Sequence, residues 1–575
     1  MTGNVKLLLF LALLFATPIF SQVTTVTIQP SASAGKDAMV IDVNPSVNYG
    51  GLNFMRVMNS VDYLNRGYIE IDVTSIPLNA IIIEAKLKLF GYTVWSPTTM
   101  EVSRVIEPWQ ENAITWANVP NVTNVDIKTQ TFGSSNNVFH EIDVRSHVQE
   151  FVNYPHLNFG WRLRPQNETS NGNGSVYWTS DYTSSAKRPK LEISYVLPIE
   201  ITANQIIHAD TPSSSNGSIS VNATEGDGTY TYQWINGATG NDIPGETSST
   251  INNLSPGWYG VKVTDGLGNI SYMAFVVGAK CGEVTIEFQP DGRFVDDTHV
   301  ISGVTPNVPS NYPNMNFGSG TILYTDRYFQ NLPYYNYNRE FLIRNRIIIS
   351  DNIELNSAEQ YLYGVNHYSQ FGNECVLKNI SEDWNENIVT WNTKPNYGSS
   401  IVTIPSTTPQ TQNISLNLTN LYNDYQNGTV TNKGQSMLLN YPPSNLNRRV
   451  GFASSDHGSS DMRPKLVLHL GKICQKGYVT LKRTLDASYT FTKFGILHFS
   501  FSNDYEQLDN DLSIKLYDSQ RVEIPLTGSE YILYDDNRVK LDLNGMGLIN
   551  DRFYFIEVYL TKGERRYLRF QYKNS

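Results

Sequence analysis

The feature that constrains this chain most is a tryptophan-rich stretch that occurs twice. It reads EPWQENAITWANVP at 107–120 and EDWNENIVTWNTKP at 382–395, with Glu, Trp, Glu-Asn, Thr-Trp and Pro at the same offsets. The interval that follows is also constant, because Trp116 stands 73 residues before Pro189 and Trp391 stands 73 residues before Pro464. A repeat of this length is a whole domain, so the chain contains two copies of one domain.

The segments around this repeat alternate between apolar and polar residues. YIEIDV at 68–73, IIIEAKLKLFGY at 81–92 and KLEISYV at 190–196 have the period of two that half-buried β-strands show. One segment has a helical period: IDVRSHVQEFVN places three apolar residues on one face, with Asp143 before them as a cap, and LNLTNLYNDYQNG holds the same place in the second copy. We predict all-β sandwiches, each with a short helix over one end.

Further motifs flank the repeated stretch in both copies. They are an Asn-Arg pair that opens an apolar run (Asn65, Asn338), TSD at 179–181 or SSD at 454–456, and RPKL at Arg188 or Arg463. On these motifs, and on NFGWRLR at 158–164, the copies resemble the DNRLRE domain family, over about 23–197 and 283–471. The resemblance implies jelly-roll domains, similar to carbohydrate-binding modules, of secreted bacterial proteins. NKGQSMLL at 432–439 replaces NFGWRLR, which argues against a binding role for Arg162 and Arg164 that both copies share.

The segment between the copies has a different texture. NGSISVNATEGDGTYTYQW and INNLSPGWYGVKVTDGLGN resemble the SprB-type repeat, an immunoglobulin-like or PKD-like module, and Trp234 and Tyr259 are expected in its core. After Cys474, alternating runs from YVTLKRTL to YLRFQY predict a small β-sandwich of unknown role. The predicted order is a signal peptide at 1–21, DNRLRE-like jelly rolls at 22–197 and 281–473, an immunoglobulin-like domain at 198–280 between them, and the C-terminal sandwich at 474–575.

The first 21 residues predict export. Lys6 precedes an apolar run that is too short to span a bilayer, and Ser21 supplies a small residue before the cut. No later segment has the ~20 apolar residues of a membrane helix, so no membrane span is expected after signal removal. The formal charge of −11 is spread along the chain without a basic stripe, which argues against nucleic acid as a partner. We expect a secreted or cell-surface protein.

Three cysteines stand at positions 281, 375 and 474. Cys281 immediately precedes and Cys474 immediately follows the second large copy, and the ends of a domain often lie close together. We predict a disulfide between Cys281 and Cys474, with Cys375 as a buried thiol. Three buried reduced cysteines are the alternative, and no His and Asn or Asp pattern supports a catalytic cysteine.

The tryptophans common to both copies are interpreted as scaffold, because packing is the simplest reason for a Trp that two divergent copies share. Glu111, between two of them, is expected to bind backbone N–H groups. The predicted structural signature comprises Trp109, Trp116, Trp384, Trp391, Arg188 and Arg463.

Candidate sugar-binding residues are therefore sought where the copies differ. Aromatic rings present flat apolar faces to sugars, while Arg, Asn and Asp bind hydroxyl groups. The candidates are Trp95, Trp161, Arg162, Arg164 and Trp178 in the first copy and Tyr334, Tyr335 and Tyr337 in the second. Burial in the sandwich is the alternative for Trp161 and Trp178, whereas the tyrosines follow Pro333 in a loop and are expected to be exposed.

No motif of a nucleophile, a phosphate-binding loop or a zinc site occurs, so no catalytic residue, metal or cofactor is predicted. Structural calcium is the alternative, at Asp504, Asp509 and Asp511 or at the matching positions Asp181 and Asp456, although no spacing matches a full oxygen cage.

Three functions fit these patterns. The favoured one is a secreted, non-catalytic surface protein that binds or adheres to polysaccharide, with avidity from two weak modules. The second is a structural stalk or envelope component whose partners are other surface proteins. The third is a polysaccharide-degrading enzyme, for which the C-terminal unit of about 100 residues is small.

Overall fold

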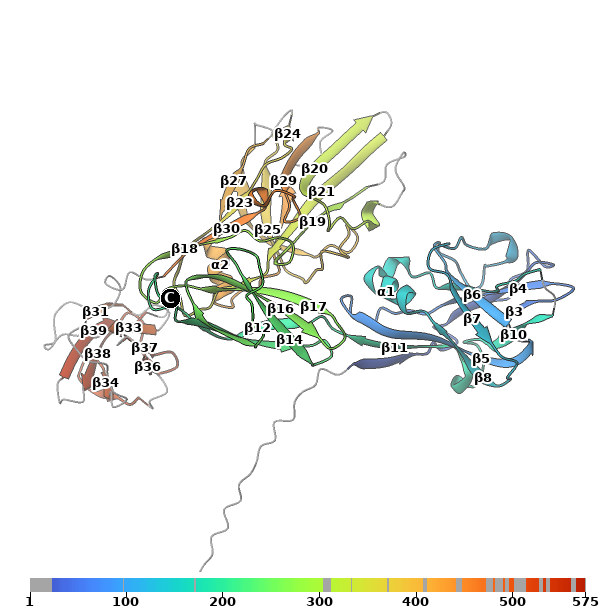
Figure 1. Cartoon of the computed structure of the whole chain (residues 1–575), viewed down its shortest axis with the longest axis horizontal. Coiled ribbons are helices and arrows are strands. Elements are labelled where there is room, and N and C mark those ends of the chain that lie inside the picture. The colour runs from blue at the N-terminus through green and yellow to red at the C-terminus, as the bar shows by residue number, and fades with distance from the viewer. Residues whose placement is uncertain are drawn as a thin grey trace, which may run out of the picture. The chain divides into compact units, whose positions relative to one another are not determined.

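The computed structural model describes residues 23–96, 98–169, 172–303, 312–331, 334–369, 372–406, 411–440, 447–471, 479–480, 490–491, 496–500, 513–526, 531–533, 538–559 and 565–573. This part of the chain is built from β-strands and two α-helices, which confirms the predicted all-β class (Figure 1). The chain divides into two compact units, of which the second consists of Ala279–Glu283 and Gly471–Ser575. Among the described helices, none is long and apolar enough to cross a membrane. The predicted signal peptide lies outside the described residues.

The first module is a sandwich of two antiparallel layers. One layer has the strand order β1-β11-β5-β8 and the other β10-β3-β4-β9-β6-β7, with β2 paired to β4. Strand β5 belongs to both layers, because its first part pairs with β11 and β8 and its last part with β10. The bounds are β1 Thr24–Ile28, β2 Lys36–Ile41, β3 Phe54–Asn59, β4 Leu64–Glu70, β5 Ile81–Ser96, β6 Thr98–Arg104, β7 Lys128–Phe132, β8 Val138–Asp143, β9 Trp161–Pro165, β10 Asn173–Trp178 and β11 Lys190–Val196.

The second module repeats this order strand for strand. Its layers run β18-β30-β23-β27 and β24-β29-β20-β21-β28-β25-β26, with β19 paired to β21, and the long β5 is replaced by two strands, β23 and β24. The bounds are β18 Val284–Phe288, β19 Val295–Ile301, β20 Ile322–Asn331, β21 Tyr334–Asn345, β22 Ile347–Ile348, β23 Leu355–Leu362, β24 Tyr368–Ser369, β25 Cys375–Ile380, β26 Tyr397–Ile404, β27 Ile414–Asn417, β28 Gln435–Leu439, β29 Arg448–Ala453 and β30 Lys465–Leu470.

A short helix follows the same strand in each module, as predicted. Helix α1 (Arg145–Asn153) buries Val148 and Phe151 in the core of the first sandwich, and α2 (Thr419–Gln426) takes the same place in the second. Asp143 Oδ1 accepts the N–H of Arg145 at 2.9 Å, which stabilises the first turn. The 3₁₀ turns are η1 Trp116–Asn118, η2 Pro155–Leu157, η3 Ser185–Lys187, η4 Tyr312–Asn314 and η5 Ser460–Met462.

The segment between the modules is a smaller two-sheet domain. Its sheets have the orders β12-β13-β15 and β14-β16-β17, and its core includes the fully buried Trp234, with Tyr259 packed against it as predicted. Strand β17 also pairs in parallel with β22, and Trp258 packs edge to face on Phe288 and Phe294 of the second module at 5.0 and 5.5 Å. The bounds are β12 Glu200–Ile207, β13 Gly217–Thr224, β14 Tyr230–Asn236, β15 Thr250–Leu254, β16 Gly257–Asp265 and β17 Ile270–Val277.

The second unit contains two further sheets around an apolar cluster. Their orders are β31-β33-β37-β36 and β32-β39-β38-β34-β35, in agreement with the predicted C-terminal sandwich. The bounds are β31 Val479–Thr480, β32 Thr490–Phe491, β33 Ile496–Ser500, β34 Ser513–Tyr517, β35 Glu523–Ile524, β36 Tyr531–Leu533, β37 Arg538–Asp542, β38 Phe553–Tyr559 and β39 Arg565–Gln571.

Candidate functional site

One layer of the first module carries charged side chains on the side that faces away from the core. In β9 the side chains of Trp161 and Leu163 lie in the main core, so the residues between and after them point to the opposite side. We call this side of β4, β6 and β9 the outer face. Its polar members are Arg66, Glu101, Ser103, Arg162 and Arg164.

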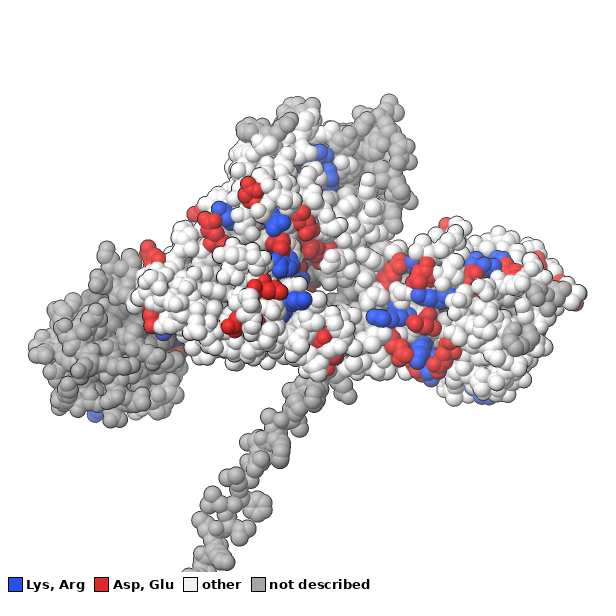
Figure 2. Space-filling view, in the orientation of Figure 1, with Lys and Arg blue, Asp and Glu red and all other residues white. Residues whose placement is uncertain are grey.

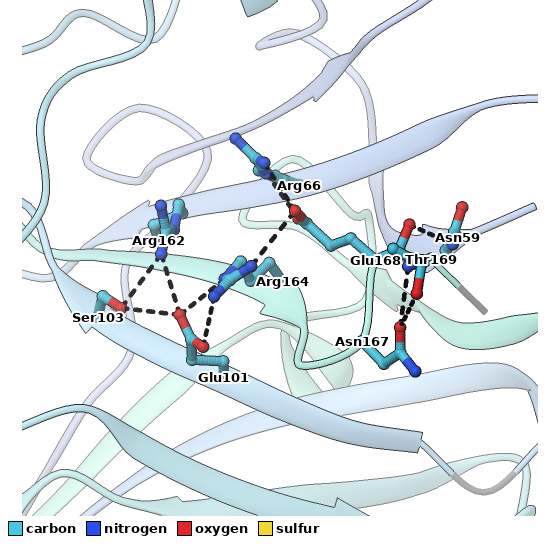
Figure 3. Close-up of polar contacts among 9 residues, drawn as sticks. All are labelled: Asn59, Arg66, Glu101, Ser103, Arg162, Arg164, Asn167, Glu168 and Thr169. Carbon is cyan, nitrogen blue, oxygen red and sulfur yellow. Dashed lines mark hydrogen bonds and ion pairs between the residues drawn. The ribbon is translucent and has the colours of Figure 1, made fainter. Parts of the chain in front are cut away.

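Two arginines of β9 converge on one carboxylate of β6 (Figure 3). Arg164 binds Glu101 with two parallel bonds, Nε to Oε1 at 2.7 Å and Nη2 to Oε2 at 2.6 Å. Arg162 Nη2 donates to Glu101 Oε1 at 3.0 Å and to Ser103 Oγ at 3.3 Å. Burial raises the pKa of Glu101, but the hydrogen bonds and charges of the two arginines outweigh burial and hold the pKa below its usual range.

A second carboxylate, Glu168, extends this network to β4. Arg66 binds Glu168 through Nε at 2.7 Å and Nη2 at 2.8 Å, and Arg164 Nη1 lies 3.3 Å from the same carboxylate. Three guanidinium groups therefore share two carboxylates, which leaves one positive charge in excess. These side chains are partly exposed, so the network is accessible to a ligand.

The repeated tryptophan stretch packs on the outer face beside this network. Trp109 belongs to a second apolar cluster with Tyr68 of β4, and its indole Nε1 donates to the carbonyl of Phe159 at 2.9 Å. Trp116 is half-buried and lies under the guanidinium of Arg66, 4.6 Å from it. An aromatic ring and a row of charged groups thus adjoin on one surface, a combination that suits both the apolar and the hydroxyl-bearing parts of a sugar.

The second module keeps the tryptophans and changes the charges. Asp37 pairs with Ile69 in the first module and Asp297 pairs with Ile343 in the second, so the two isoleucines are equivalent. Three residues earlier on the same strands, Arg66 therefore corresponds to Glu340. This differs by one residue from the alignment of the two Asn-Arg pairs in the sequence. Glu340 binds Lys394 Nζ at 2.5 Å, and this ammonium lies 3.4 Å from the ring centre of Trp391.

The Glu101–Arg164 pair has no counterpart in the second module. Glu101 pairs with Arg164 across β6 and β9, and the same register in β25 and β28 pairs Val376 with Leu438. Ser436 stands where Arg162 would be. The outer faces of the two modules therefore differ chemically, which agrees with the expectation that they share no arginine-based binding role.

The structure separates the predicted binding residues of the first module. Arg162 and Arg164 lie together on the outer face, and Trp95 is 52% exposed at the end of β5. Trp161 is fully buried, packs on Phe151 and donates from Nε1 to His147 Nδ1 at 3.0 Å, so its prediction as a sugar contact is wrong.

Trp178 is half-buried in an aromatic stack. Tyr92 and Tyr182 lie on its two sides, each with its ring centre 3.9 Å away and nearly parallel. Because both faces of the indole are covered, a direct stacking role for Trp178 itself is wrong, and the tyrosine rings carry the outer surfaces of the stack.

The tyrosine candidates of the second module are only partly described. Tyr337 is half-buried, with Arg339 5.3 Å from its ring centre. The side chains of Tyr334 and Tyr335 lie outside the described residues.

The residues predicted as structural occupy matching positions. Trp384 is buried like Trp109 and donates from Nε1 to the carbonyl of Lys433 at 2.8 Å. The RPKL arginines also match, because Arg188 Nε donates to the carbonyl of Tyr182 at 2.8 Å and Arg463 Nε to that of His457 at 3.2 Å.

The cysteines follow the prediction as far as they are described. Cys375 is a buried free thiol, and burial raises its pKa. Cys281 is disulfide-bonded. Cys474 lies outside the described residues, so its pairing with Cys281 stays a prediction, and the same is true of calcium binding at Asp504, Asp509 and Asp511.

Arg66 was not predicted as a ligand contact, and two further residues of the network, Glu101 and Glu168, were not singled out at all. Neither belongs to a repeated motif, and only the pairing of β6 with β9 brings Glu101 to the arginines. On the face shown in Figure 2, acidic and basic side chains lie intermingled, so this view shows no extended patch of one charge.

A model of carbohydrate-binding module family 96 matches residues 28–195 and 296–469. The chain belongs to carbohydrate-binding module family 96. The two family 96 modules coincide with the two sandwiches, and an SprB repeat matches residues 213–239 between them. Both resemblances are thus confirmed at the level of carbohydrate-binding modules and an SprB repeat, and the narrower DNRLRE assignment stays a prediction.

Comparisons with whole proteins add little. No curated protein sequence matches this family 96 chain. One similar solved structure is β-glucuronidase 3 of Bacteroides uniformis, with 10% sequence identity, a match over 43% of this chain and 29% of that chain, and a TM-score of 0.14. Another is the N-terminal eight immunoglobulin domains of Down syndrome cell adhesion molecule, with 10% sequence identity, a match over 96% of this chain and 69% of that chain, and a TM-score of 0.16. The chain spans less than a third of the length of the Bacteroides enzyme. Likenesses with such TM-scores carry no argument about activity.

Proposed function

We propose that this protein is a secreted, non-catalytic surface protein that binds polysaccharide, with the outer face of the first family 96 module as its main binding surface. The observation that carries the proposal is the network of Arg66, Arg162 and Arg164 with Glu101 and Glu168 beside the Trp116 ring. Family membership supports carbohydrate as the ligand class.

The chemistry of the network suits hydroxyl groups arranged along a chain. Guanidinium groups offer several N–H donors in one plane, and the carboxylates that they bind keep free lone pairs for hydroxyl donors. Mutual ion pairs hold these side chains in place before the ligand arrives, so little conformational entropy is lost on binding. The half-buried ring of Trp116 carries the Arg66 guanidinium, and the part of the ring that Arg66 leaves uncovered is available to the C–H side of a sugar.

The second module is expected to contribute a different or weaker contact. Val376 and Leu438 replace the Glu101–Arg164 pair, whereas Trp391 keeps its place and carries the Lys394 ammonium over its ring. Two unlike modules on one chain raise the apparent affinity for a polymer that offers both ligands. The SprB repeat supports a place at the bacterial cell surface and a role in adhesion.

A polysaccharide microarray tests this proposal against its two rivals. The array should include neutral and uronic-acid polymers, and every bound polymer should then be incubated with the protein and assayed for new reducing ends. Binding without release of reducing ends is the expected result. Binding with release would establish a degrading enzyme, and absence of binding to any polymer would favour a structural component with protein partners.

A further inference from the structure

Three carboxylates meet in the first module at the rim of the sandwich. Asp37 lies near the start of β2, Glu111 in the repeated tryptophan stretch, and Asp181 in the segment after β10. One oxygen of each carboxylate lies within 4.8 Å of the others. Asp37 is 1% exposed, whereas the other two are half-buried. The group therefore has a buried floor and an open side.

The second module repeats the same hydrogen bonds, although among the described residues only the group of the first module has its three oxygens within 4.8 Å of one another. Glu111 Oε1 accepts the N–H of Asp37 at 2.9 Å, and Glu386 Oε1 accepts the N–H of Asp297 at 3.0 Å. Each aspartate side chain also accepts a backbone N–H from the serine that precedes Asp181 or Asp456. Asp37 Oδ2 accepts the N–H of Ser180 at 2.9 Å, and Asp297 Oδ2 accepts that of Ser455 at 2.7 Å. Asp456 completes the second group, and its charge acts on Asp297.

Oxygen atoms at the floor of both groups lack partners. Oδ1 of Asp37 and Oδ1 of Asp297 are buried and accept no hydrogen bond from any described residue. The hydroxyls of Ser180 and Ser455 are also buried and make no hydrogen bond of normal geometry. Each hydroxyl nevertheless lies close enough to Asp37 or Asp297 to lower the pKa of that carboxyl. Buried polar atoms in folded proteins are paired as a rule, so the same two orphaned atoms in both modules indicate a missing partner.

Glycine residues let the backbone approach these groups closely. A Cβ on Gly35 would lie 2.0 Å from the Ser180 hydroxyl, and a Cβ on Gly292 would lie 2.9 Å from Asp456 Oδ1. Side chains at these two positions would therefore collide with Ser180 or Asp456.

A cation suits this site, because three carboxylates converge on it in the first module. Lys36 acts on Glu111, but its ammonium is already paired with Glu70 at 2.5 Å. In the second module Arg344 and Arg346 bind the adjacent Asp296.

We propose that each family 96 module binds one calcium ion between its three carboxylates, at Asp37, Glu111 and Asp181 in the first module and at Asp297, Glu386 and Asp456 in the second. Carboxylate and hydroxyl oxygens are the ligands that hard cations prefer, and water fills the remaining places of the roughly six to eight that calcium requires. Each group contains no His or Cys among these ligands, which disfavours zinc.

The ion would connect three segments that are distant in the sequence. It holds β2, the repeated tryptophan stretch and the turn after β10 together, and so fixes the loop that places Trp116 on the outer face. This gives Glu111 and Glu386 a role beyond their backbone hydrogen bonds. The proposal is independent of the polysaccharide, because the site stabilises the fold whether or not a sugar binds.

The test is a calcium titration of the full-length protein after removal of metal with EDTA. We expect calcium to raise the midpoint of thermal unfolding and EDTA to lower it again, with magnesium giving a smaller rise at equal concentration. Equilibrium dialysis with radioactive calcium then counts the ions bound per chain. The proposal is overturned if wild-type protein binds no calcium and its unfolding midpoint is the same in calcium and in EDTA.

Matched variants assign the ions to these residues. Asp37→Asn and Asp297→Asn keep the size of the side chain and remove its charge, so each variant should fold and bind one calcium fewer, and the double variant two fewer. Asp62→Asn, an exposed aspartate of the first module, is the control and should leave the count unchanged. If both single variants bind as many ions as wild type, the calcium lies elsewhere and the proposal is wrong.

Discussion

The buried histidine His147 makes the first module sensitive to mild acid. Its Nδ1 accepts the indole N–H of Trp161 at 3.0 Å, and its Nε2 lies 2.6 Å from the carbonyl oxygen of Asp126. Because an indole N–H can only donate, Nδ1 must be unprotonated and Nε2 must carry the hydrogen. Protonation of His147 would break the bond to Trp161 inside the core. Burial accordingly lowers the pKa of His147 to about 4, although Asp126 partly offsets this effect.

The size and direction of the effect follow from this shift. The pKa of a histidine is 6.5 in the unfolded chain and that of His147 is about 4 in the folded module, which corresponds to ~3 kcal/mol of stability at neutral pH. As the pH falls below 6.5 the unfolded chain takes up a proton that the folded chain cannot. The stability contributed by neutral His147 is therefore complete above pH 6.5 and is lost progressively toward pH 4.

Differential scanning calorimetry between about pH 7.5 and about pH 4.5 measures this loss. His147→Gln is the matched variant, because its amide can accept the Trp161 N–H and donate to Asp126 without titrating. The first-module transition, identified as the one that the substitution shifts at neutral pH, should fall less with acid in the variant than in wild type. Identical pH dependence in the two proteins would refute the role of His147.

Three further predictions concern packing and reactivity. Trp258→Ala should destabilise the SprB domain together with the second module by about 3 to 5 kcal/mol, seen as one lowered calorimetric transition, since the indole is buried between them; two transitions of which only one moves would contradict shared packing. Cys375 should resist iodoacetamide until the protein unfolds, because its thiol is buried, and rapid native labelling would show otherwise. Arg188→Met and Arg463→Met should each cost about 1 kcal/mol in urea denaturation, because each removes one hydrogen bond to a backbone carbonyl; a loss confined to one variant would show that the RPKL endings are not equivalent.

Much of the fold was predictable because the sequence contains two versions of it. The constant spacing of the tryptophan stretch marked residues that pack identically in both modules, and Trp109 and Trp384 are buried with the same kind of backbone bond. Strand boundaries were less certain. The run at 68–73 was predicted as one strand, whereas β4 ends at Glu70.

The candidate site was harder to predict, because strand pairing decides which side chains meet. Alternation alone does not say which face of β9 is the core, so Trp161 and Arg162 were both proposed as ligand contacts, yet they point to opposite sides. The pairing of β6 with β9 that brings Glu101 to the arginines joins segments about 60 residues apart.

The aspartates of the proposed calcium sites did leave a trace in the sequence. Asp37 and Asp297 each begin a D-x-x-V-I pattern, DAMVI and DTHVI, at the start of equivalent strands. The pattern is too short to stand out without the register that aligns the two modules. Asp181 and Asp456 were recognised as matching positions, but the third and most buried ligand was missed.

The most direct test of the central claim converts the outer face of the first module into that of the second. The variant Glu101→Val with Arg162→Ser and Arg164→Leu reproduces Val376, Ser436 and Leu438 at the same register. Replacing all three side chains leaves no arginine of β9 without its carboxylate, and exchanging a buried ion-pair group for uncharged side chains is often neutral for stability, so the variant should fold. Asp62→Asn, at an exposed aspartate outside the network, is the control.

Affinity electrophoresis in gels that contain the polysaccharide bound most strongly on the microarray gives the dissociation constants of all three proteins. We predict that the triple variant binds at least about tenfold more weakly than wild type, equivalent to about 1.4 kcal/mol, and that Asp62→Asn binds like wild type. Unchanged retention of the triple variant would contradict the outer face as the binding surface.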